Sequence, residues 1–244
     1  MKNTFRYLSY LACCGFLLTG CEAESTAEIS EVTNFAVFDL TGSDEILLHK
    51  GEEYVEPGAT AEEAGEPVEV STNISQGWFR GQNFDTDISD FYTVSYSAIN
   101  QDGFEATVSR TIIVAENGDL VDDISGLYRS SIVRNGATNP NQQGIEYVLI
   151  WEKEPGVYGI SDAIGGWYMY GTNYGIGYAA QGATITKNGP NSFTSSSTVP
   201  VGAFGGEAKI TAITTNPQAK TIDITTNWAT FGYVFEVHLE QVQF

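Results

Sequence analysis

The chain has 244 residues, with 31 acidic side chains against 11 basic ones and a formal net charge of -20 at pH 7. This charge excludes a nucleic-acid-binding protein and a protein that docks on anionic lipid through basic residues, because both need clustered Lys and Arg. Hydrophobic residues make up 42% of the chain, which is enough to fill real cores, and the length favours two domains.

The N-terminal residues have the pattern of a bacterial export signal. Lys2 and Arg6 precede an apolar run over residues 8–18, and the sequence L-T-G-C follows, ending at Cys21. The run is too short to span a bilayer as a permanent helix, so it predicts a removable signal over residues 1–20. The motif resembles the lipobox of bacterial lipoproteins, which implies acylation of Cys21 and an outer-membrane anchor. The alternative is an ordinary signal peptide with a chance cysteine.

An acidic segment follows Cys21 and predicts a solvated tether over residues 21–32. It resembles the segment after the lipidated cysteine in surface-exported lipoproteins of Bacteroidetes, which implies a position facing the cell exterior. On composition alone, a solvated linker that does not direct the protein to the cell surface is an equal alternative. Cys13 and Cys14 would leave with the signal, so no cysteine remains for a disulfide, a thiolate nucleophile or a metal site.

Short apolar-polar alternations predict a first β domain over residues 33–115. One expected strand places four apolar side chains on a single face: Tyr92, Val94, Tyr96 and Ala98. The turn N-Q-D-G at residues 100–103 joins it to the next strand, so the two form an antiparallel hairpin. Strands with one buried and one wet face predict a β-sandwich.

Three blocks of this domain resemble the Ig-like domain repeated in many bacterial surface proteins. They are Y-V-E-P-G-A-T-A at residues 54–61, Y-T-V-S-Y-S-A at 92–98 and R-T-I-I-V at 110–114. Glu56 stands where that family usually has Asp. The resemblance implies an Ig-like β-sandwich that serves as a spacer or presentation module.

The loop D-T-D-I-S-D in this domain brings three carboxylates together in sequence: Asp85, Asp87 and Asp90. Carboxylate oxygens are the ligands that Ca²⁺ prefers. The loop lacks the Gly and the terminal Glu of an EF-hand, so a solvated loop is expected and calcium is the weaker alternative. We expect no other metal and no cofactor.

The charge character changes at residues 115–123, and a second β domain is predicted over residues 124–244. Its expected strands cover residues 126–133, 147–154, 174–187, 192–199, 207–215, 221–228 and 232–242. Their short, even spacing predicts an up-and-down antiparallel meander that closes into a barrel. Along the last strand, Tyr233, Phe235 and Val237 share the predicted core face, and Glu236 and His238 the opposite one.

The second domain resembles a lipocalin-like domain of unknown function that follows the Ig-like domain in lipoproteins of gut Bacteroidetes. The motifs that carry the resemblance are I-S-G-L-Y-R at residues 124–129, I-S-D-A-I-G-G-W-Y at 160–168, Y-A-A-Q-G-A-T-I at 178–185 and V-H-L-E at 237–240. Such proteins are often encoded beside outer-membrane glycan importers in polysaccharide-utilisation loci. The resemblance therefore implies a lipocalin-like β-barrel and capture of polysaccharide.

Residues 165–178 read G-G-W-Y-M-Y-G-T-N-Y-G-I-G-Y. In an extended strand, Trp167 and Met169 would face one side and Tyr168 and Tyr170 the other, so only one pair fills the core. The other pair would form a platform for apolar sugar faces, with glycines leaving the approach open. The alternative is that all these rings pack inside the barrel and the glycines serve its corners.

The predicted ligand site also includes two polar residues near these rings, Asp162 and Asn173, and Trp228. Trp228 belongs to a second aromatic group with Phe231 and Tyr233, near a strand turn that would share the same rim. Catalysis is poorly supplied, because the only histidines, His49 and His238, lie in no nucleophile or metal spacing. Asp162 is the only acid near these rings, and a single acid is better suited to orienting a ligand hydroxyl than to hydrolysing a glycosidic bond. The alternative is that S-D at residues 161–162 caps a turn.

The sequence therefore predicts a non-enzymatic, lipid-anchored surface protein that binds glycan through Trp167, Tyr168, Tyr170 and Trp228, with polar help from Asp162 and Asn173. Two alternatives stay open. The same rings would dock the chain onto an outer-membrane protein as an accessory subunit, or the barrel would carry a small apolar ligand.

Overall fold

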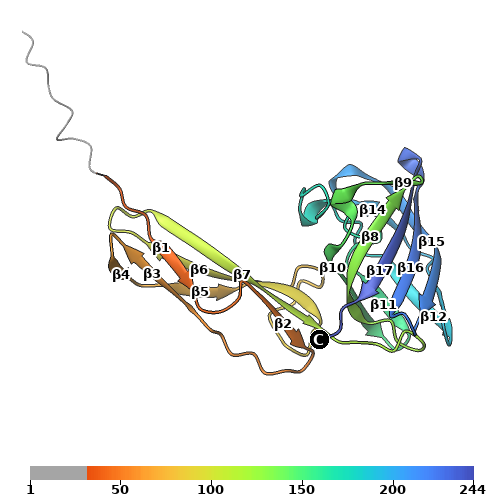
Figure 1. Cartoon of the computed structure of the whole chain (residues 1–244), viewed down its shortest axis with the longest axis horizontal. Helices are drawn as coiled ribbons and strands as arrows, with labels where there is room; N and C mark the ends of the chain where they lie inside the picture. Colours follow the sequence, from red (N-terminus) through yellow and green to blue (C-terminus); the bar gives the residue numbers. More distant parts are fainter. Residues whose placement is uncertain (1–31) are drawn as a thin grey trace, which may run out of the picture. The chain divides into compact units, whose positions relative to one another are not determined.

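The computed structural model describes residues 32–244, which are all-β, as predicted (Figure 1). The expected signal peptide, Cys21 and most of the expected tether lie outside the described residues. Within the described part of the chain, no helix is long and apolar enough to cross a membrane.

The first domain is a β-sandwich of two sheets. One sheet has the order β1 (Val37–Leu40), β3 (Ala59–Glu63), β4 (Glu66–Val68). The other has the order β2 (Glu45–His49), β7 (Glu105–Ala115), β6 (Asp90–Ile99), β5 (Ser71–Ile74), with β2 parallel to β7. β6 and β7 form the expected antiparallel hairpin, and Tyr92, Val94, Tyr96 and Ala98 are all buried in the core.

Glu56 organises the turn between β2 and β3. Its carboxylate accepts hydrogen bonds from the hydroxyls of Tyr54 and Tyr96 and from the backbone N–H of Gly58. Burial raises the pKa of Glu56, but the two tyrosine hydroxyls and the backbone donor outweigh it, so the pKa lies below its ordinary value. The buried Arg110 closes the network by donating to the carbonyl of Gly58. Glu56 thus ties the turn to β6 and β7.

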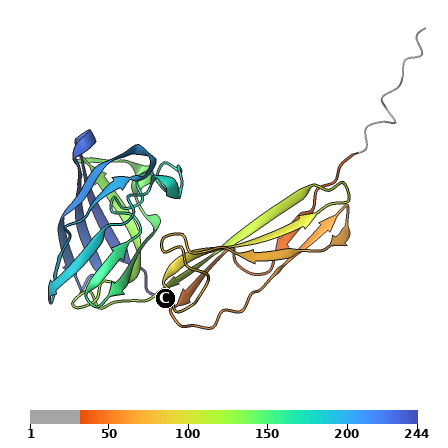
Figure 2. The ribbon, with the colours of Figure 1, turned by 180° about the vertical axis from the view of Figure 1, so that it is seen from behind.

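The second domain is one ten-stranded antiparallel sheet that curls on itself (Figure 2). The strand order is β13 (Ser192–Thr194), β12 (Thr184–Gly189), β11 (Val157–Ile160), β10 (Ile145–Glu154), β8 (Gly126–Arg134), β17 (Tyr233–Gln241), β16 (Thr221–Trp228), β15 (Gly205–Asn216), β14 (Thr198–Val201). The short β9 (Ala137–Thr138) pairs with β8. The curled sheet confirms the predicted barrel-like class, and its interior is filled by apolar side chains such as Ile132, Ile164 and Phe235.

Several barrel strands follow the predicted pattern. β16 has the expected bounds, and β17 buries Phe235, Val237 and Leu239 while Glu236 and Glu240 face solvent. This alternation confirms the last strand.

Other expected barrel strands were wrong. Residues 174–183 are not a strand, because turns and the 3-10 helix η3 (Ile176–Tyr178) precede β12. The stretch 192–199 is divided between β13 and β14, and β11 was missed.

The strand directions bring several loops to one end of the barrel, here called the distal end. β8, β11, β14 and β16 end there, and β10, β15 and β17 begin there. The loop over residues 161–180, η4 (Gly202–Phe204) and η5 (Ala229–Phe231) therefore meet at the distal end. The linker over residues 116–125 leads into the opposite end, because β8 begins there.

Candidate ligand-binding site

The glycine-bounded rings lie in a compact loop over residues 161–180, here called the aromatic loop, and not in the extended strand expected. Tyr170 N–H donates to the carbonyl of Gly166 (3.0 Å), and Tyr174 N–H donates to the carbonyl of Tyr168 (3.1 Å). Gly165 has a φ of 74°, and a Cβ there would lie 2.6 Å from Val237 Cγ1. The loop approaches the barrel core so closely that only glycine fits at this position.

Asp162 is buried at the base of the aromatic loop and does not reach solvent. Its Oδ1 accepts hydrogen bonds from the backbone N–H groups of Ile164 (2.9 Å) and Ala180 (3.1 Å), so one oxygen joins the two ends of the loop. Its Oδ2 has no hydrogen-bond partner, and burial raises the pKa of Asp162 to about 6. Asp162 therefore shapes the loop, and the expectation that it orients a ligand hydroxyl was wrong, because it is out of reach.

The structure separates the ring pairs by burial. Trp167 and Met169 are buried, with the Trp167 ring against Phe235 (5.6 Å between centroids), whereas Tyr168 and Tyr170 are half-buried. Trp228 is also buried, at 1% exposure. Neither Trp167 nor Trp228 thus exposes a ring face on which a ligand could stack. Both instead pack beneath the more exposed rings, Trp228 against Phe204 and Phe231.

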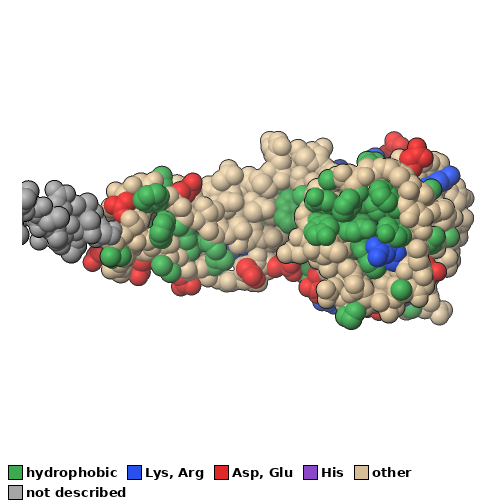
Figure 3. All heavy atoms as spheres, turned by 90° about the horizontal axis from the view of Figure 1, so that it is seen from above, with side chains coloured by type: hydrophobic (Ala, Val, Ile, Leu, Met, Phe, Trp, Pro, Cys, Tyr) green, Lys and Arg blue, Asp and Glu red, His purple; other side chains and the backbone are tan. Residues whose placement is uncertain are grey.

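Exposed and half-buried rings gather at the distal end of the barrel. We call them the distal patch: Tyr168, Tyr174, Tyr178, Phe204, Phe231 and Tyr233, packed around Trp228. Tyr174 is 55% exposed, Phe231 51% and Phe204 41%. Figure 3 looks onto this end of the barrel and shows hydrophobic side chains gathered in one patch beside a basic group.

The rings of the distal patch are arranged in flat pairs. Tyr168 and Tyr174 are stacked, with centroids 6.3 Å apart and planes 10° from parallel. Phe231 and Tyr233 form a second stacked pair, 6.5 Å apart and 12° from parallel. A shallow hollow of about 370 Å³ lies among Tyr174, Tyr178 and Phe204. The patch therefore offers both flat ring faces and a concave seat.

Arg134 supplies the charge beneath the distal patch. Its guanidinium lies over the rings of Trp167 (4.4 Å) and Tyr233 (4.5 Å), and its Nη1 donates to the hydroxyl of Tyr168 (3.3 Å). Burial raises the pKa of the Tyr168 phenol, against the lowering effect of Arg134. Cation–π contacts of this kind hold the guanidinium and both rings in fixed positions.

The remaining predicted ligand residues lie on another side of the aromatic loop. Tyr170 and Asn173 line a separate hollow of about 380 Å³ together with Met169, Ile176 and Trp78. Asn173 adopts a left-handed conformation with a φ of 57°. The structure thus divides the six predicted residues among the core, the distal patch and this second hollow.

Sequence reasoning placed Phe231 and Tyr233 near the site, but it missed Phe204. Its signal was a phenylalanine among small residues in G-A-F-G-G at residues 202–206, the same composition as the aromatic loop. Nothing in the sequence showed that these two segments meet.

The proposed calcium ligands do not converge. Asp90 is fully buried, and its two oxygens accept backbone N–H groups of Phe79, Arg80 and Phe91, while Asp85 accepts the N–H of Asp87. Among the described residues, no group of three or more His, Cys, Asp or Glu is placed to hold a metal ion. The calcium alternative was therefore wrong, because both carboxylate oxygens of Asp90 already accept hydrogen bonds from backbone N–H groups.

The two histidines lie in different parts of the fold. His238 contacts Asp223 on β16 (Nδ1 to Oδ1, 2.7 Å) on the outer face of the sheet, and its side chain is 44% exposed. The His49 ring packs against Phe244 (4.7 Å between centroids). Neither residue reaches the distal patch.

Two family models match successive parts of the chain. Residues 117–241 match the family model described as "-like, C-terminal domain". The chain belongs to this C-terminal domain family. Residues 38–114 match the model of the bacterial surface protein Ig-like domain, as the first-domain motifs indicated.

A solved structure extends the likeness to both domains. The crystal structure of the lipoprotein BT2262 from Bacteroides thetaiotaomicron is 29% identical, with a TM-score of 0.64, and the match covers 85% of this chain and 100% of that one. A comparison with curated proteins finds no match.

Proposed function

We propose that this protein is a lipid-anchored, non-catalytic protein of the outer membrane that captures glycan outside the cell at the distal patch, within a polysaccharide-utilisation system. The lipobox ending at Cys21 and the likeness to a Bacteroides lipoprotein support the anchor. The match of residues 38–114 to a surface-protein Ig-like domain supports the exterior location. In this proposal the Ig-like domain is the spacer.

The observation that carries the proposal is the set of exposed rings of the distal patch, Tyr174, Phe204 and Phe231, together with the shallow hollow at Tyr174 and Phe204. Tyr174 and Phe204 present open faces at the hollow, and the apolar face of a pyranose stacks on such rings. Arg134 locks Tyr168 and Tyr233 in place, so little rotamer freedom is lost on binding.

Binding without hydrolysis is also part of the proposal. Glycosidases use two carboxyl groups that flank the bond to be cleaved. Asp162, the single acid of the aromatic loop, is buried at its base, and the hollow of the patch is lined by Tyr174, Tyr178 and Phe204 alone. This arrangement suits retention of a sugar better than its cleavage.

The proposal is tested by affinity electrophoresis of residues 22–244 in gels that contain plant, host or microbial polysaccharides. We expect at least one polysaccharide to retard the protein, and Tyr174→Ala or Phe204→Ala to weaken that binding about tenfold, because each removes one stacked ring. Phe104→Ala, in the Ig-like domain, is the matched control, because Phe104 is 52% exposed but lies outside the patch. Uniform mobility on every polysaccharide would refute glycan capture.

The exposure of Tyr174, Phe204 and Phe231 at one end of the barrel favours one alternative, docking of the patch onto an outer-membrane protein. In a pull-down from solubilised membranes, an accessory subunit would retain one protein partner, lose it in Phe204→Ala, and ignore sugars. The apolar-carrier alternative has less support, because fully buried side chains such as Ile132 and Ile164 fill the barrel interior.

A further inference from the structure

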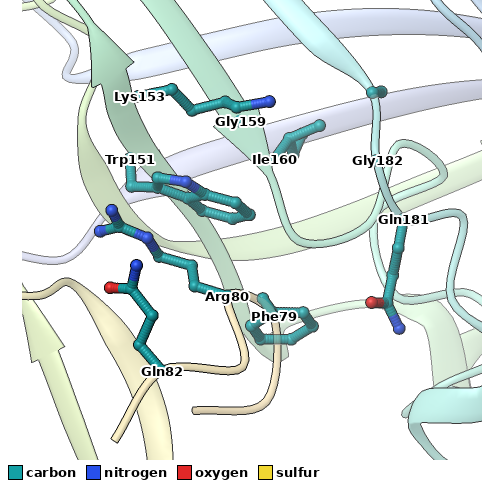
Figure 4. A pocket seen from close by; sticks show the side chains of 10 residues that line it. Phe79, Arg80, Gln82, Trp151, Lys153, Gly159, Ile160, Gln181 and Gly182 are labelled. Atoms are coloured by element: carbon teal, nitrogen blue, oxygen red, sulfur yellow. The ribbon is translucent and has the colours of Figure 1, made fainter. Parts of the chain in front are cut away.

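A second concave surface lies outside the distal patch, on the outer face of β10. It is a cleft of about 470 Å³ between the loop before β6 and the wall of the barrel (Figure 4). Its lining residues are Phe79, Arg80, Gln82, Trp151, Lys153, Gly159, Ile160, Gln181, Gly182 and Ala183. The distal patch and this cleft share no residue.

The charge of the cleft is opposite to that of the chain. No Asp or Glu is among the lining residues, although the formal net charge of the protein is -20. In the described part of the chain, Lys50, Arg129 and Lys187 are each paired with a carboxylate, whereas Arg80 and Lys153 form no ion pair. Two unpaired cations therefore face one cleft, where an anion gains from both.

An aromatic floor lies between these cations. The rings of Phe79 and Trp151 are stacked, 6.4 Å apart and 24° from parallel. The Trp151 indole lies across Gly159, where a Cβ would come within 2.5 Å of the ring. Trp151 also packs in an apolar cluster with Phe91 and Ile113. Gly159, Phe91 and Ile113 thus hold the Trp151 ring in a fixed position.

The polar groups of the cleft are positioned for a ligand with hydroxyls. Asp90 accepts hydrogen bonds from the backbone N–H groups of Phe79 and Arg80, which fixes the loop from which Arg80 lines the cleft. Gln181 Nε2 donates to the carbonyl of Ile176 (3.0 Å), so its Oε1 remains available as an acceptor. Figure 4 shows Arg80, Gln82, Lys153 and Gln181 surrounding the two rings.

We propose that this cleft binds an acidic saccharide, with the carboxylate or sulfate held between Arg80 and Lys153 and the sugar hydroxyls bound by Gln82 and Gln181. Phe79 supplies the apolar contact with the sugar ring. The site acts independently of the distal patch, so the chain holds an acidic glycan at a place separate from the ring stacks.

Isothermal titration calorimetry of residues 22–244 tests the proposal with three probes: tetragalacturonate, a sulfated galactan tetrasaccharide and neutral galactotetraose. We expect one or both acidic probes to bind at least tenfold more tightly than the neutral one, with an affinity that falls as salt rises. The carboxylated and sulfated probes show which anion is preferred. Arg80→Gln and Lys153→Gln should each weaken that binding about tenfold.

Lys209→Gln is the matched control, because Lys209 is an exposed lysine on β15 that forms no ion pair in the described residues and does not line the cleft. Equal binding of acidic and neutral probes, or an equal loss in Lys209→Gln, would overturn the proposal. Binding of free galacturonate as tight as that of the tetramer would reduce the cleft to a simple anion site and would also overturn it.

The same variants distinguish binding at the distal patch from binding in the cleft. Phe204→Ala should leave binding of the acidic probe unchanged, and Arg80→Gln should leave retardation by a polysaccharide at the distal patch unchanged. If Phe204→Ala abolishes acidic binding while Arg80→Gln does not, the acidic saccharide binds at the patch and the cleft proposal fails alone.

Discussion

One loop at each proposed site is built around a buried aspartate. In the Ig-like domain, Asp90 Oδ1 accepts the N–H groups of Phe79 (3.0 Å) and Phe91 (2.8 Å), and Oδ2 accepts that of Arg80 (2.8 Å). In the barrel, Asp162 uses Oδ1 alone, and its Oδ2 has no partner. The first carboxylate is satisfied on both oxygens, and the second is not.

The difference shows how an incomplete set of hydrogen bonds destabilises the ionised form of a buried carboxyl group. Burial raises the pKa of both residues, and the backbone N–H donors lower it. For Asp162 the result is a pKa of about 6, because the effect of burial exceeds the lowering effect of the backbone N–H groups of Ile164, Ala180 and Gly166. The aromatic loop is therefore held by a group whose ionised form is poorly stabilised, because one desolvated oxygen lacks a donor.

The largest effect is expected from Asp90→Ala. The substitution leaves three backbone N–H groups of the loop without an acceptor, and we expect a loss of about 3 kcal/mol or more in the free energy of unfolding. Urea unfolding at pH 7.5 measures this loss. Asp87→Ala is the control, because Asp87 is exposed and the change should stay within about 0.5 kcal/mol. Equal stability of the two variants would mean that Asp90 does not hold the loop.

The pH dependence of stability sharpens the comparison for Asp162. Its folded-state pKa of about 6 lies above its ordinary value of 3.8, so the folded state holds the proton more tightly than the unfolded state. Stability from this group is fully present below about pH 4 and is lost as the pH rises through 6. The total loss is about 3 kcal/mol for a shift of about two units.

Asp162→Asn should remove this loss, because the amide keeps the Oδ1 acceptor and carries no charge. We expect the stability of the variant relative to the parent to rise by up to about 3 kcal/mol between pH 4 and 7, measured by urea unfolding at several pH values. Glu152→Gln is a control with an exposed carboxylate and should show no such rise. A difference that stays flat with pH would contradict the incomplete satisfaction of Asp162.

A smaller effect is expected where a tryptophan lies on a glycine. Gly159→Ala places a methyl group within 2.5 Å of the Trp151 ring, and the packed indole must shift, at a cost of about 2 kcal/mol. Gly177→Ala, where a Cβ meets nothing within 4 Å, should change stability by less than about 0.5 kcal/mol. Thermal unfolding of the two variants compares them directly, and equal melting temperatures would show that the indole is not confined.

The alternating strands were predictable from the sequence. The period of two in residues 92–98 and in β17 identified which side chains are buried, because a strand packed on one side must alternate. The Ig-like motifs also identified the first part of the chain, which the bacterial surface Ig-like family model matches over residues 38–114.

The aromatic loop was harder to predict. Strand alternation correctly separated Trp167 from Tyr168, although the backbone there is a series of turns. The place of Asp162 near the rings suggested a ligand role, whereas the structure has it accept the N–H of Ile164, as the alternative of a turn cap implied, and that of Ala180, 18 positions away. Asp90 misled in the same way, since its partners Phe79 and Arg80 come from a different loop.

By itself, the sequence determined the all-β class and the presence of glycine-bounded rings, because these depend on local composition and period, and it predicts an export signal on the same basis. Only the tertiary structure decided which rings are exposed, brought Phe204 to Tyr174, and placed Arg80 beside Trp151 across the two domains. These arrangements depend on strand order and loop closure, which join residues far apart in the chain and leave no local pattern in it.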